Sequence, residues 1–509
     1  MNVHEQAAFA HARLSHGLFP TANFWHMMTI FMSTPIMLMG CTSDAGKSFL
    51  TAALCRHFAN HGVRVAPFKA QNMSNNAAVC PAGGEIGRAQ ALQAAACGLE
   101  PTVDMNPVLI KPEADARSQV VVMGRPWRTL GAKNYYDYKA SLWEQVTGAL
   151  DRLRANYELV IIEGAGSAAE LNLRAGDIVN MAVARYAQAP VLLVGDIDRG
   201  GIFAQLIGTL WLLEPEERAL VRGLVVNKFR GDPALFVDGV RILEVKAGVP
   251  VLGVVPYLRD LYLPEEDAVA IDQESELTGA MEFDVDVAVI HLPCIANFDD
   301  FDPLLTEPGV RLRYVDAPEA LGQPDAIILP GTKSTAGDLE WLRQRGLARL
   351  ITDFAQKGGA VAGICGGYQM LGEAIYDPEH IETSAEQTPG LGLLPTTTRF
   401  VSDKATYRAR ASVQSQRAWL APLAGQTVEG YEIHMGITEG NQPWLKIADR
   451  NGTPVDVSDG SLSASGRVWG CYLHGLFGNE NLRHAWLTSL GWKGGHPATP
   501  RLRLDLPSR

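Results

Sequence analysis

Cys365 is the residue of this 509-residue chain best suited to nucleophilic chemistry. It follows the apolar run Val361–Ile364 and precedes Gly366 and Gly367. A short strand followed at once by small residues predicts a sharp strand-to-helix turn, which presents a nucleophile beside free backbone N–H groups. A thiol in that setting can attack an amide and form a thioester, provided that a base takes its proton.

His474 is the predicted base, because it directly follows the apolar segment Val468–Leu473, where a late strand is expected to end. Backbone N–H groups near Gly366 and in the loop Leu329–Ser334 are the expected oxyanion donors. The residue two positions after His474 is Leu476, so no carboxylate stands at that spacing to orient the imidazole. The sequence therefore predicts a Cys365–His474 dyad, or a base that some other group orients.

A glycine-rich loop, Gly40–Ser48, follows the apolar run Ile36–Met39 and predicts a phosphate site. Exposed N–H groups at a helix start bind phosphate, a lysine adds charge, and a serine hydroxyl can ligate magnesium. The two outer glycines are six residues apart instead of the usual five, a longer loop that resembles the dethiobiotin synthetase variant. The residues expected to bind ATP here are Gly40, Thr42, Gly46, Lys47 and Ser48.

Carboxylates and an amide follow other predicted strands of the same half. Glu163 ends a buried strand, where an unpartnered carboxylate would be desolvated, and magnesium coordination together with Ser48 explains its placement. A helix cap or a surface carboxylate is the alternative. Glu85 is a further candidate magnesium ligand, and Asn227, after another strand, is a candidate for hydrogen bonding to the purine of ATP.

The segment Lys69–Asn76 is dense in amide donors and acceptors, which suit a polar substrate with carboxylate and amide groups. A hydrogen-bonded turn is the alternative. Glu432 and His434 are further candidates for substrate contacts. The substrate residues expected from the segment are Lys69, Gln71, Asn72 and Asn75.

Short apolar strands alternate with helical stretches twice along the chain, which predicts an α/β protein with two doubly wound domains. In such sheets the ligand site lies beyond the carboxyl ends of the strands, where the residues above are expected to meet. The expected divisions are a flexible N-terminal extension (1–34), a nucleotide domain (35–260), a polar linker (261–284), a thiol domain (285–492) and a C-terminal tail (493–509). The expected strands are Ile36–Met39, Val63–Phe68, Leu159–Ile162, Pro190–Val194, Leu224–Val226, Val251–Val255, Val287–His291, Ala326–Leu329, Ala360–Ile364 and Val468–Leu473; the expected helices include Gly46–His61, Glu85–Cys97, Asp338–Arg345 and Leu347–Lys357.

Composition excludes several classes of function. The 44 basic and 56 acidic residues leave a net charge of −12, which argues against a broad grip on nucleic acid. The 7 cysteines are scattered and odd in number, which argues against a disulfide framework or structural zinc and favours a reducing cytoplasm. No apolar run is long enough to predict a membrane span. The sequence leaves the oligomeric state open.

Known families share these motifs. The turn at Cys365, the late His474 and the loop Leu329–Ser334 resemble the triad-type, or class I, glutamine amidotransferases, whose third catalytic member is usually a glutamate at the position of Leu476. From about residue 35 onward, nearly the whole chain resembles the cobyric acid synthases, a family of corrinoid amidotransferases in which that glutamate is usually missing. The more specific runs are Lys69–Asn76, Gly84–Gln90, Asn106–Pro112, Glu163–Glu170 and Ala296–Pro303.

The resemblance implies an enzyme of cobalamin biosynthesis, a ligase that uses ATP, magnesium and glutamine. It implies amidation of the b, d, e and g carboxylates of adenosylcobyrinic acid a,c-diamide, through an acyl phosphate and ammonia from glutamine. The alternatives are a cobyrinic acid a,c-diamide synthase, which the asparagine-rich Lys69–Asn76 run disfavours, and a regulatory ATPase with an inactive amidotransferase domain, which Leu476 keeps open. CTP synthase, which shares both domain types, ends its amidotransferase motif in His-Pro-Glu, and this chain does not.

Overall fold

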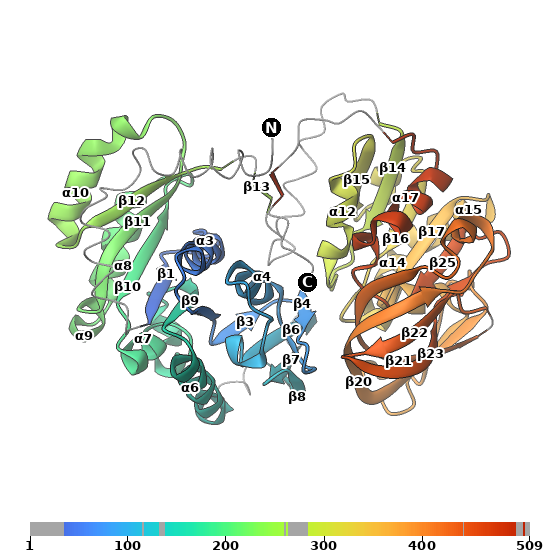
Figure 1. Cartoon of the computed structure of the whole chain (residues 1–509), viewed down its shortest axis with the longest axis horizontal. Helices are drawn as coiled ribbons and strands as arrows, with labels where there is room; N and C mark the ends of the chain where they lie inside the picture. Colours follow the sequence, from blue (N-terminus) through green and yellow to red (C-terminus); the bar gives the residue numbers. More distant parts are fainter. Residues whose placement is uncertain are drawn as a thin grey trace.

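The computed structural model describes residues 35–114, 117–131, 138–258, 261–262, 283–440, 442–494 and 502–503. The predicted N-terminal extension (1–34), most of the predicted linker and most of the predicted C-terminal tail lie outside these residues. Figure 1 shows an N-terminal domain, coloured blue to green, beside a C-terminal domain, coloured yellow to red. Within the described part of the chain, no helix combines the length and the apolar character needed to cross a bilayer.

A six-stranded parallel sheet forms the centre of the N-terminal domain, in the order β12-β11-β10-β1-β9-β2. Its strands are buried because helices cover them, as a parallel sheet requires. The six strands expected from the sequence are present, with shifted ends. They are β1 (Ile36–Gly40), β2 (Val65–Phe68), β9 (Leu159–Ser167), β10 (Val191–Asp196), β11 (Val221–Phe229) and β12 (Val251–Pro256); the helices are α3 (Lys47–Asn60), α4 (Arg88–Ala96), α6 (Lys139–Asn156), α7 (Met181–Ala187), α8 (Ile202–Leu212), α9 (Pro215–Arg218) and α10 (Val237–Ala247).

A smaller sheet, which the sequence did not predict, interrupts this domain between β2 and α6. Figure 1 shows it, together with α4, between the parallel sheet and the C-terminal domain. The predicted helix Glu85–Cys97 is wrong at its start, because its first three residues form a strand and the helix begins at Arg88. The small sheet has the order β3 (Gln71–Met73), β6 (Val108–Ala114), β7 (Arg117–Val122) and β8 (Arg125–Gly131), and β4 (Ala77–Val79) pairs with β5 (Glu85–Gly87) beside it.

The C-terminal domain is built on a second sheet in the order β15-β14-β16-β17-β25-β24. All of its pairings are parallel except that of β24 with β25. The strands are β14 (Val285–Ile290), β15 (Val310–Val315), β16 (Ala326–Leu329), β17 (Ala360–Ile364), β24 (Ser461–Leu462) and β25 (Val468–Cys471). The helices are α12 (Asp302–Leu305), α13 (Pro318–Leu321), α14 (Thr335–Gln344), α15 (Leu347–Gln356), α16 (Gly366–Leu371) and α17 (Glu480–Ser489).

A further sheet of this domain, also not predicted, lies toward the N-terminal domain, and its pairings are antiparallel except that of β18 with β20. Its two long strands, β20 and β21, pair along most of their length. A cluster of buried apolar side chains joins it to the small sheet of the other domain: Ala77, Val79, Leu109, Val121, Tyr431 and Ile433. The strands are β18 (Ala374–Tyr376), β19 (Gln387–Pro389), β20 (Thr396–Val413), β21 (Thr427–Gly440), β22 (Leu445–Arg450) and β23 (Thr453–Asp459); the remaining short pair is β13 (Leu261–Tyr262) with β26 (Leu502–Arg503).

Candidate active site

Cys365 lies at the turn between β17 and α16 with a backbone φ of 51° and ψ of −109°. A non-glycine residue at positive φ stores strain, and such strain is typical of a nucleophile held at a sharp turn. The thiol-bearing residue is buried, and its N–H donates to the Cys471 carbonyl oxygen at 2.9 Å. The structure therefore has the turn that the glycine-flanked thiol predicts.

Glycines make this turn possible by letting backbones touch. A methyl group at Gly367 would lie 2.0 Å from the Leu329 carbonyl oxygen. One at Gly331 would lie 3.0 Å from Cε1 of His474 and 3.8 Å from Cβ of Cys365. The loop after β16 therefore lies directly against the thiol and the imidazole, where its backbone can face a developing oxyanion.

Asp300 orients the base. Nδ1 of His474 lies 2.6 Å from Oδ2 of Asp300, and both side chains are buried. The other carboxylate oxygen accepts from the Gly475 N–H at 2.8 Å and from the Tyr431 hydroxyl at 3.3 Å. The Tyr431 ring stacks on the imidazole with a centroid distance of 5.1 Å. Cys365, His474 and Asp300 thus form a triad whose acid follows β14.

Charge at this triad favours the imidazolium form. Burial by itself favours the neutral ring, but the Asp300 carboxylate and the neighbouring Cys365 outweigh it and raise the pKa of His474 to about 10. Cys365 is also a hydrogen-bond partner of the imidazole. At neutral pH the arrangement therefore favours an imidazolium beside the sulfur of Cys365, a setting typical of catalytic cysteines.

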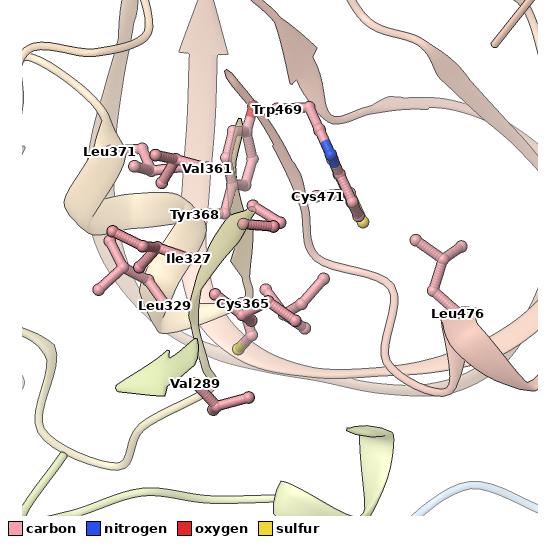
Figure 2. Packing of buried hydrophobic residues seen from close by; sticks show 14 of the residues in the cluster. Val289, Ile327, Leu329, Val361, Cys365, Tyr368, Leu371, Trp469, Cys471 and Leu476 are labelled. Carbon is pink, nitrogen blue, oxygen red and sulfur yellow. The ribbon is translucent and has the colours of Figure 1, made fainter. Parts of the chain in front are cut away.

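Leu476 packs in the apolar core instead of facing the imidazole. It is 1% exposed, and Figure 2 shows it in the cluster that also contains Trp469 and Cys471. A carboxylate there would be desolvated without a partner. Asp300 lies within the run Ala296–Pro303, which the family resemblance includes, but it was not predicted as a site residue. The available signal was a group of aspartates in the segment that follows core strand β14, since ligand sites lie beyond the carboxyl ends of such strands.

A pocket opens at the thiol, and both domains line it. Asn75 and Lys111 come from the N-terminal domain. The C-terminal domain contributes Cys365, His474 and His434, with Lys333, Gln369, Glu382 and Lys404 among the other wall residues. Cationic and acidic side chains on one wall suit the carboxylate and ammonium groups of a free amino acid.

Strand β21 carries Glu432 and His434, the two further candidates for substrate contacts, and they differ in their relation to the pocket. His434 lines the pocket and stacks on Tyr472 with a centroid distance of 3.8 Å. Glu432 accepts two hydrogen bonds of 2.7 Å from Arg450, and its Oε1 lies 3.4 Å from Nε2 of His434, so it contacts the pocket histidine.

The phosphate loop has the expected form. Gly46 adopts a φ of 90°, and a side chain there would collide with the Asn227 amide. Nζ of Lys47 donates to the carbonyl oxygens of Thr42 at 3.2 Å and Gly166 at 3.1 Å, so it lies within the loop. Nδ2 of Asn227 donates to the Ala45 carbonyl oxygen at 2.8 Å. Asn227 therefore supports the loop, and its contact with the purine stays a prediction.

Glu163 faces Ser48, as a shared magnesium site requires. Its carboxylate accepts from the Ser48 hydroxyl at 2.7 Å and from Nε2 of Gln93 at 2.5 Å, and Nζ of Lys69 lies 3.0 Å away. Burial opposes ionisation, but Lys69 and the two hydrogen-bond donors outweigh it and lower the pKa of Glu163. Among the described residues, no group of three or more His, Cys, Asp and Glu side chains could hold a metal ion. Mg²⁺ does not need one, because it keeps waters and binds nucleotide phosphates beside one or two protein oxygens.

Glu85 is not brought to that pair, which corrects the prediction that it joins Ser48 and Glu163. Its buried carboxylate contacts Nζ of Lys111 at 2.5 Å and Nζ of Lys404, and the two lysines outweigh burial and lower its pKa to about 2. Two ammonium groups already neutralise it, so it has no need of a metal ion. Lys404 comes from β20, so this cluster crosses the domain interface.

The four predicted substrate residues do not form one surface. Lys69 belongs to the phosphate site, Gln71 begins β3, and Nδ2 of Asn72 donates to Gln90 at 3.0 Å. Asn75 reaches the thiol pocket, where its buried Oδ1 has no hydrogen-bond partner. Among these residues only Asn75 is placed to meet a ligand of the pocket.

Comparison with known proteins agrees with the two-domain division. Residues 36–269 match the CobQ/CobB/MinD/ParA nucleotide binding domain, and residues 286–482 match the CobB/CobQ-like glutamine amidotransferase domain. The chain is 58% identical to a cobyric acid synthase of Chloroflexus aggregans, over 90% of this chain and 92% of the relative. It is 56% identical to one of Roseiflexus castenholzii, over 92% of this chain and 94% of the relative. On this evidence the chain belongs to the cobyric acid synthase family of glutamine amidotransferases.

Proposed function

We propose that this enzyme amidates the b, d, e and g carboxylates of adenosylcobyrinic acid a,c-diamide, using ATP and ammonia from glutamine. Beside family membership, one observation supports the proposal. Asn75 and Lys111 of the nucleotide domain line the pocket of Cys365, so ammonia is released against the domain that holds the ATP loop.

Glutamine hydrolysis uses the residues around Cys365. The thiolate attacks the side-chain amide carbon of glutamine, and the backbone N–H groups near Gly366 and Gly331 stabilise the oxyanion. His474 gives its proton to the leaving nitrogen, and ammonia departs from the thioester. Water, deprotonated by the same imidazole, then cleaves the thioester to glutamate and free thiol. Asp300 keeps the ring in the orientation that both proton transfers need.

Activation of the corrinoid uses the loop Gly40–Ser48. A substrate carboxylate oxygen attacks the γ-phosphorus of ATP, ADP leaves, and an acyl phosphate results. Lys47 and the N–H groups of the loop hold the phosphates. Ser48 and Glu163 would hold magnesium, which supplies positive charge against the phosphate oxygens. Ammonia then attacks the acyl carbon, and phosphate leaves as the amide forms.

Mass spectrometry of the corrinoid tests this function. The a,c-diamide is incubated with enzyme, ATP and glutamine, and the expected product has gained four amide groups. Cobyrinic acid is assayed in parallel. Amidation of the a and c carboxylates alone would identify the alternative diamide synthase, and no ATP-dependent amidation of either corrinoid would refute both assignments.

A further inference from the structure

Helix α4 contacts Glu163 and Ser48 of the ATP site through Gln93, and Asp299, the neighbour of the triad acid, through Arg88. At its first residue, Nε of Arg88 pairs with Oδ2 of Asp299 at 2.8 Å, across the domain interface. Five residues later, Nε2 of Gln93 donates to Glu163 at 2.5 Å and to the Ser48 carbonyl oxygen at 3.4 Å. At 1.5 Å per residue these two anchor points are about 7.5 Å apart along the helix axis. Figure 1 shows α4 between α3 and β4, on the side facing the C-terminal domain.

The residue that Arg88 holds is the neighbour of the triad acid. Asp299 and Asp300 are consecutive in the 3₁₀ helix Phe298–Phe301, and the Asp300 carboxylate is hydrogen-bonded to the imidazole of His474. Asp299 is buried, and burial raises its pKa even though Arg88 acts in the opposite direction. Removing the guanidinium would leave a carboxylate desolvated one residue from the acid that orients the base.

Two more contacts fix the same segment to the N-terminal domain. The Ala77 N–H donates to Oδ1 of Asn297 at 2.9 Å, and the Phe298 N–H donates to Oδ1 of Asn76 at 3.3 Å. The Arg88 N–H donates to the Asn76 carbonyl oxygen at 3.1 Å. The segment that carries Asp300 is therefore attached to the start of α4 both directly and through Asn76.

The helix also has unused hydrogen-bonding capacity near the nucleotide site. Oε1 of Gln93 and Nε2 of Gln90 are buried without a hydrogen-bond partner. Buried amide groups are costly to leave unpaired, so a rearrangement that pairs them stabilises the helix in a new position. A ligand that draws the Glu163 carboxylate away from Gln93 releases this end of the helix.

We infer that Arg88 is a positioning residue of the glutaminase centre, and that α4 couples the occupancy of the ATP site to the orientation of His474. The chain of contacts runs from Glu163 to Gln93, along α4 to Arg88, and from Arg88 to Asp299. Asp299 is adjacent in the chain to Asp300, whose carboxylate binds His474. Glutamine is then hydrolysed fast only when an activated corrinoid can consume the ammonia. This inference rests on the proposed function and names the residues that link its two reactions.

The test compares Arg88→Gln with Arg152→Gln in the full-length enzyme. Arg152, on α6, pairs with Asp104 at the same 2.8 Å but contacts neither centre, so it is a matched control. Three quantities are measured with and without ATP, Mg²⁺ and the corrinoid diamide: glutaminase kcat and KM, amidation from added ammonia, and the rate at which iodoacetamide alkylates Cys365, followed by peptide mass spectrometry. Arg88→Lys is the conservative variant.

In the wild type and Arg152→Gln, the ligands are expected to change glutaminase kcat and the Cys365 alkylation rate by about fivefold or more, the usual scale of coupling between sites. Arg88→Gln is expected to abolish both changes, with KM for glutamine and ammonia-dependent amidation retained, and Arg88→Lys to restore part of the response. An undiminished response in Arg88→Gln overturns the inference.

Two further outcomes distinguish failure of the coupling from failure of the proposed function. A wild type that amidates corrinoids but whose glutaminase ignores ATP refutes the coupling and leaves the function standing, whereas a wild type that amidates no corrinoid refutes the function itself. If Arg88→Gln does not fold, Asp299→Asn tests the same contact, and an unchanged response in that variant contradicts the inference.

Discussion

The imidazole of His474 lies between a thiol that follows β17 and a carboxylate that follows β14. Both groups are buried, so the charge of the Asp300 carboxylate acts on the ring with little screening by water. The raised pKa of His474, about 10, follows from this enclosure and sets the pH range in which the imidazolium exists. The position of the missing glutamate, Leu476, is therefore not a sign of an inactive domain, because Asp300 fills the role from elsewhere in the chain.

Asp300→Asn tests that role. In the wild type, the stabilisation of protonated His474 is complete below its unfolded value of 6.5 and is lost as pH rises through about 10. Glutaminase activity is therefore expected to persist up to about pH 10. Without the carboxylate the pKa falls, so the alkaline limb of kcat/KM moves to lower pH and kcat at pH 7.5 drops about a hundredfold or more. The pH profile of glutamate release measures both changes.

The other centre is the control for Asp300→Asn. Amidation from added ammonia should be unchanged in this variant, because the ATP loop does not contact Asp300. An alkaline limb that stays in place would show that another group sets the pKa of His474.

Variants of Cys365 and Lys47 test whether the C-terminal domain supplies ammonia and the N-terminal domain activates the carboxylate. Cys365→Ala is expected to remove glutamine-dependent amidation and keep amidation from added ammonia. Lys47→Ala is expected to fail with either nitrogen source, because the phosphates lose their buried cation. Corrinoid products are quantified by chromatography. Loss of both activities in Cys365→Ala, or ammonia-dependent turnover in Lys47→Ala at the wild-type rate, would contradict the assignment.

At the scale of elements, the sequence predicts the strands of the two largely parallel sheets except β15 and β24, and none of the strands of the two mixed sheets. Strands β16 and β17 match their predicted ranges because a buried parallel strand is a short, unbroken apolar run. Strand β20 has 18 residues, most of them polar or small, and contains no such run.

The same contrast separates the functional residues. Cys365, His474 and the phosphate loop each follow an apolar run, so local pattern locates them. Asp300 is 174 residues from His474, and Glu85 is 319 residues from Lys404, so only the folded chain shows these pairs.

The turn after β17 depends on the absence of a side chain at Gly367. In Gly367→Ala the new methyl group would lie 2.0 Å from the Leu329 carbonyl oxygen, and backbone must move to admit it. We expect a loss of about 1–3 kcal/mol of stability, the usual cost of overpacking, together with displaced Cys365 and low glutaminase activity. Thermal unfolding and glutamate release measure the two effects.

Gly208→Ala is the matched control, since Gly208 lies in α8 with open space where its side chain would be. It is expected to be neutral or stabilising, because alanine favours a helix. Equal stability and equal glutaminase activity in the two variants would show that the turn does not depend on the missing side chain at Gly367.

At the scale of the whole molecule, the domains meet through charge as well as apolar contact. Glu85 and Lys111 of the N-terminal domain and Lys404 of the C-terminal domain form a buried cluster, and both lysines line the thiol pocket. Burial outweighs the attraction of Glu85 and lowers the pKa of Lys404 to about 7. The domain interface beside the thiol pocket therefore depends on one carboxylate that holds a lysine from each domain.

Glu85→Gln is expected to weaken the domain interface, because it leaves the buried ammonium groups of Lys111 and Lys404 without their counter-charge. Breaking such a buried pair costs about 3–5 kcal/mol, here at the domain interface. The deficit against the wild type should shrink as pH rises from 7 toward 10. As pH approaches the ordinary lysine pKa of 10.5, removing a proton from Lys404 in the unfolded chain costs less, so burying that lysine uncharged costs less. Amide formed per glutamine hydrolysed should fall well below one, since ammonia escapes through a loosened interface. Thermal unfolding at pH 7 and pH 9, with glutamate and amide counted in the same reaction, measures both effects.

Asp456→Asn, which breaks the exposed pair with Lys446, is the control expected to change neither the stability difference nor the ratio of amide to glutamate. A Glu85→Gln enzyme that still uses every ammonia it releases would show that the cluster holds the domains together without sealing the space between them.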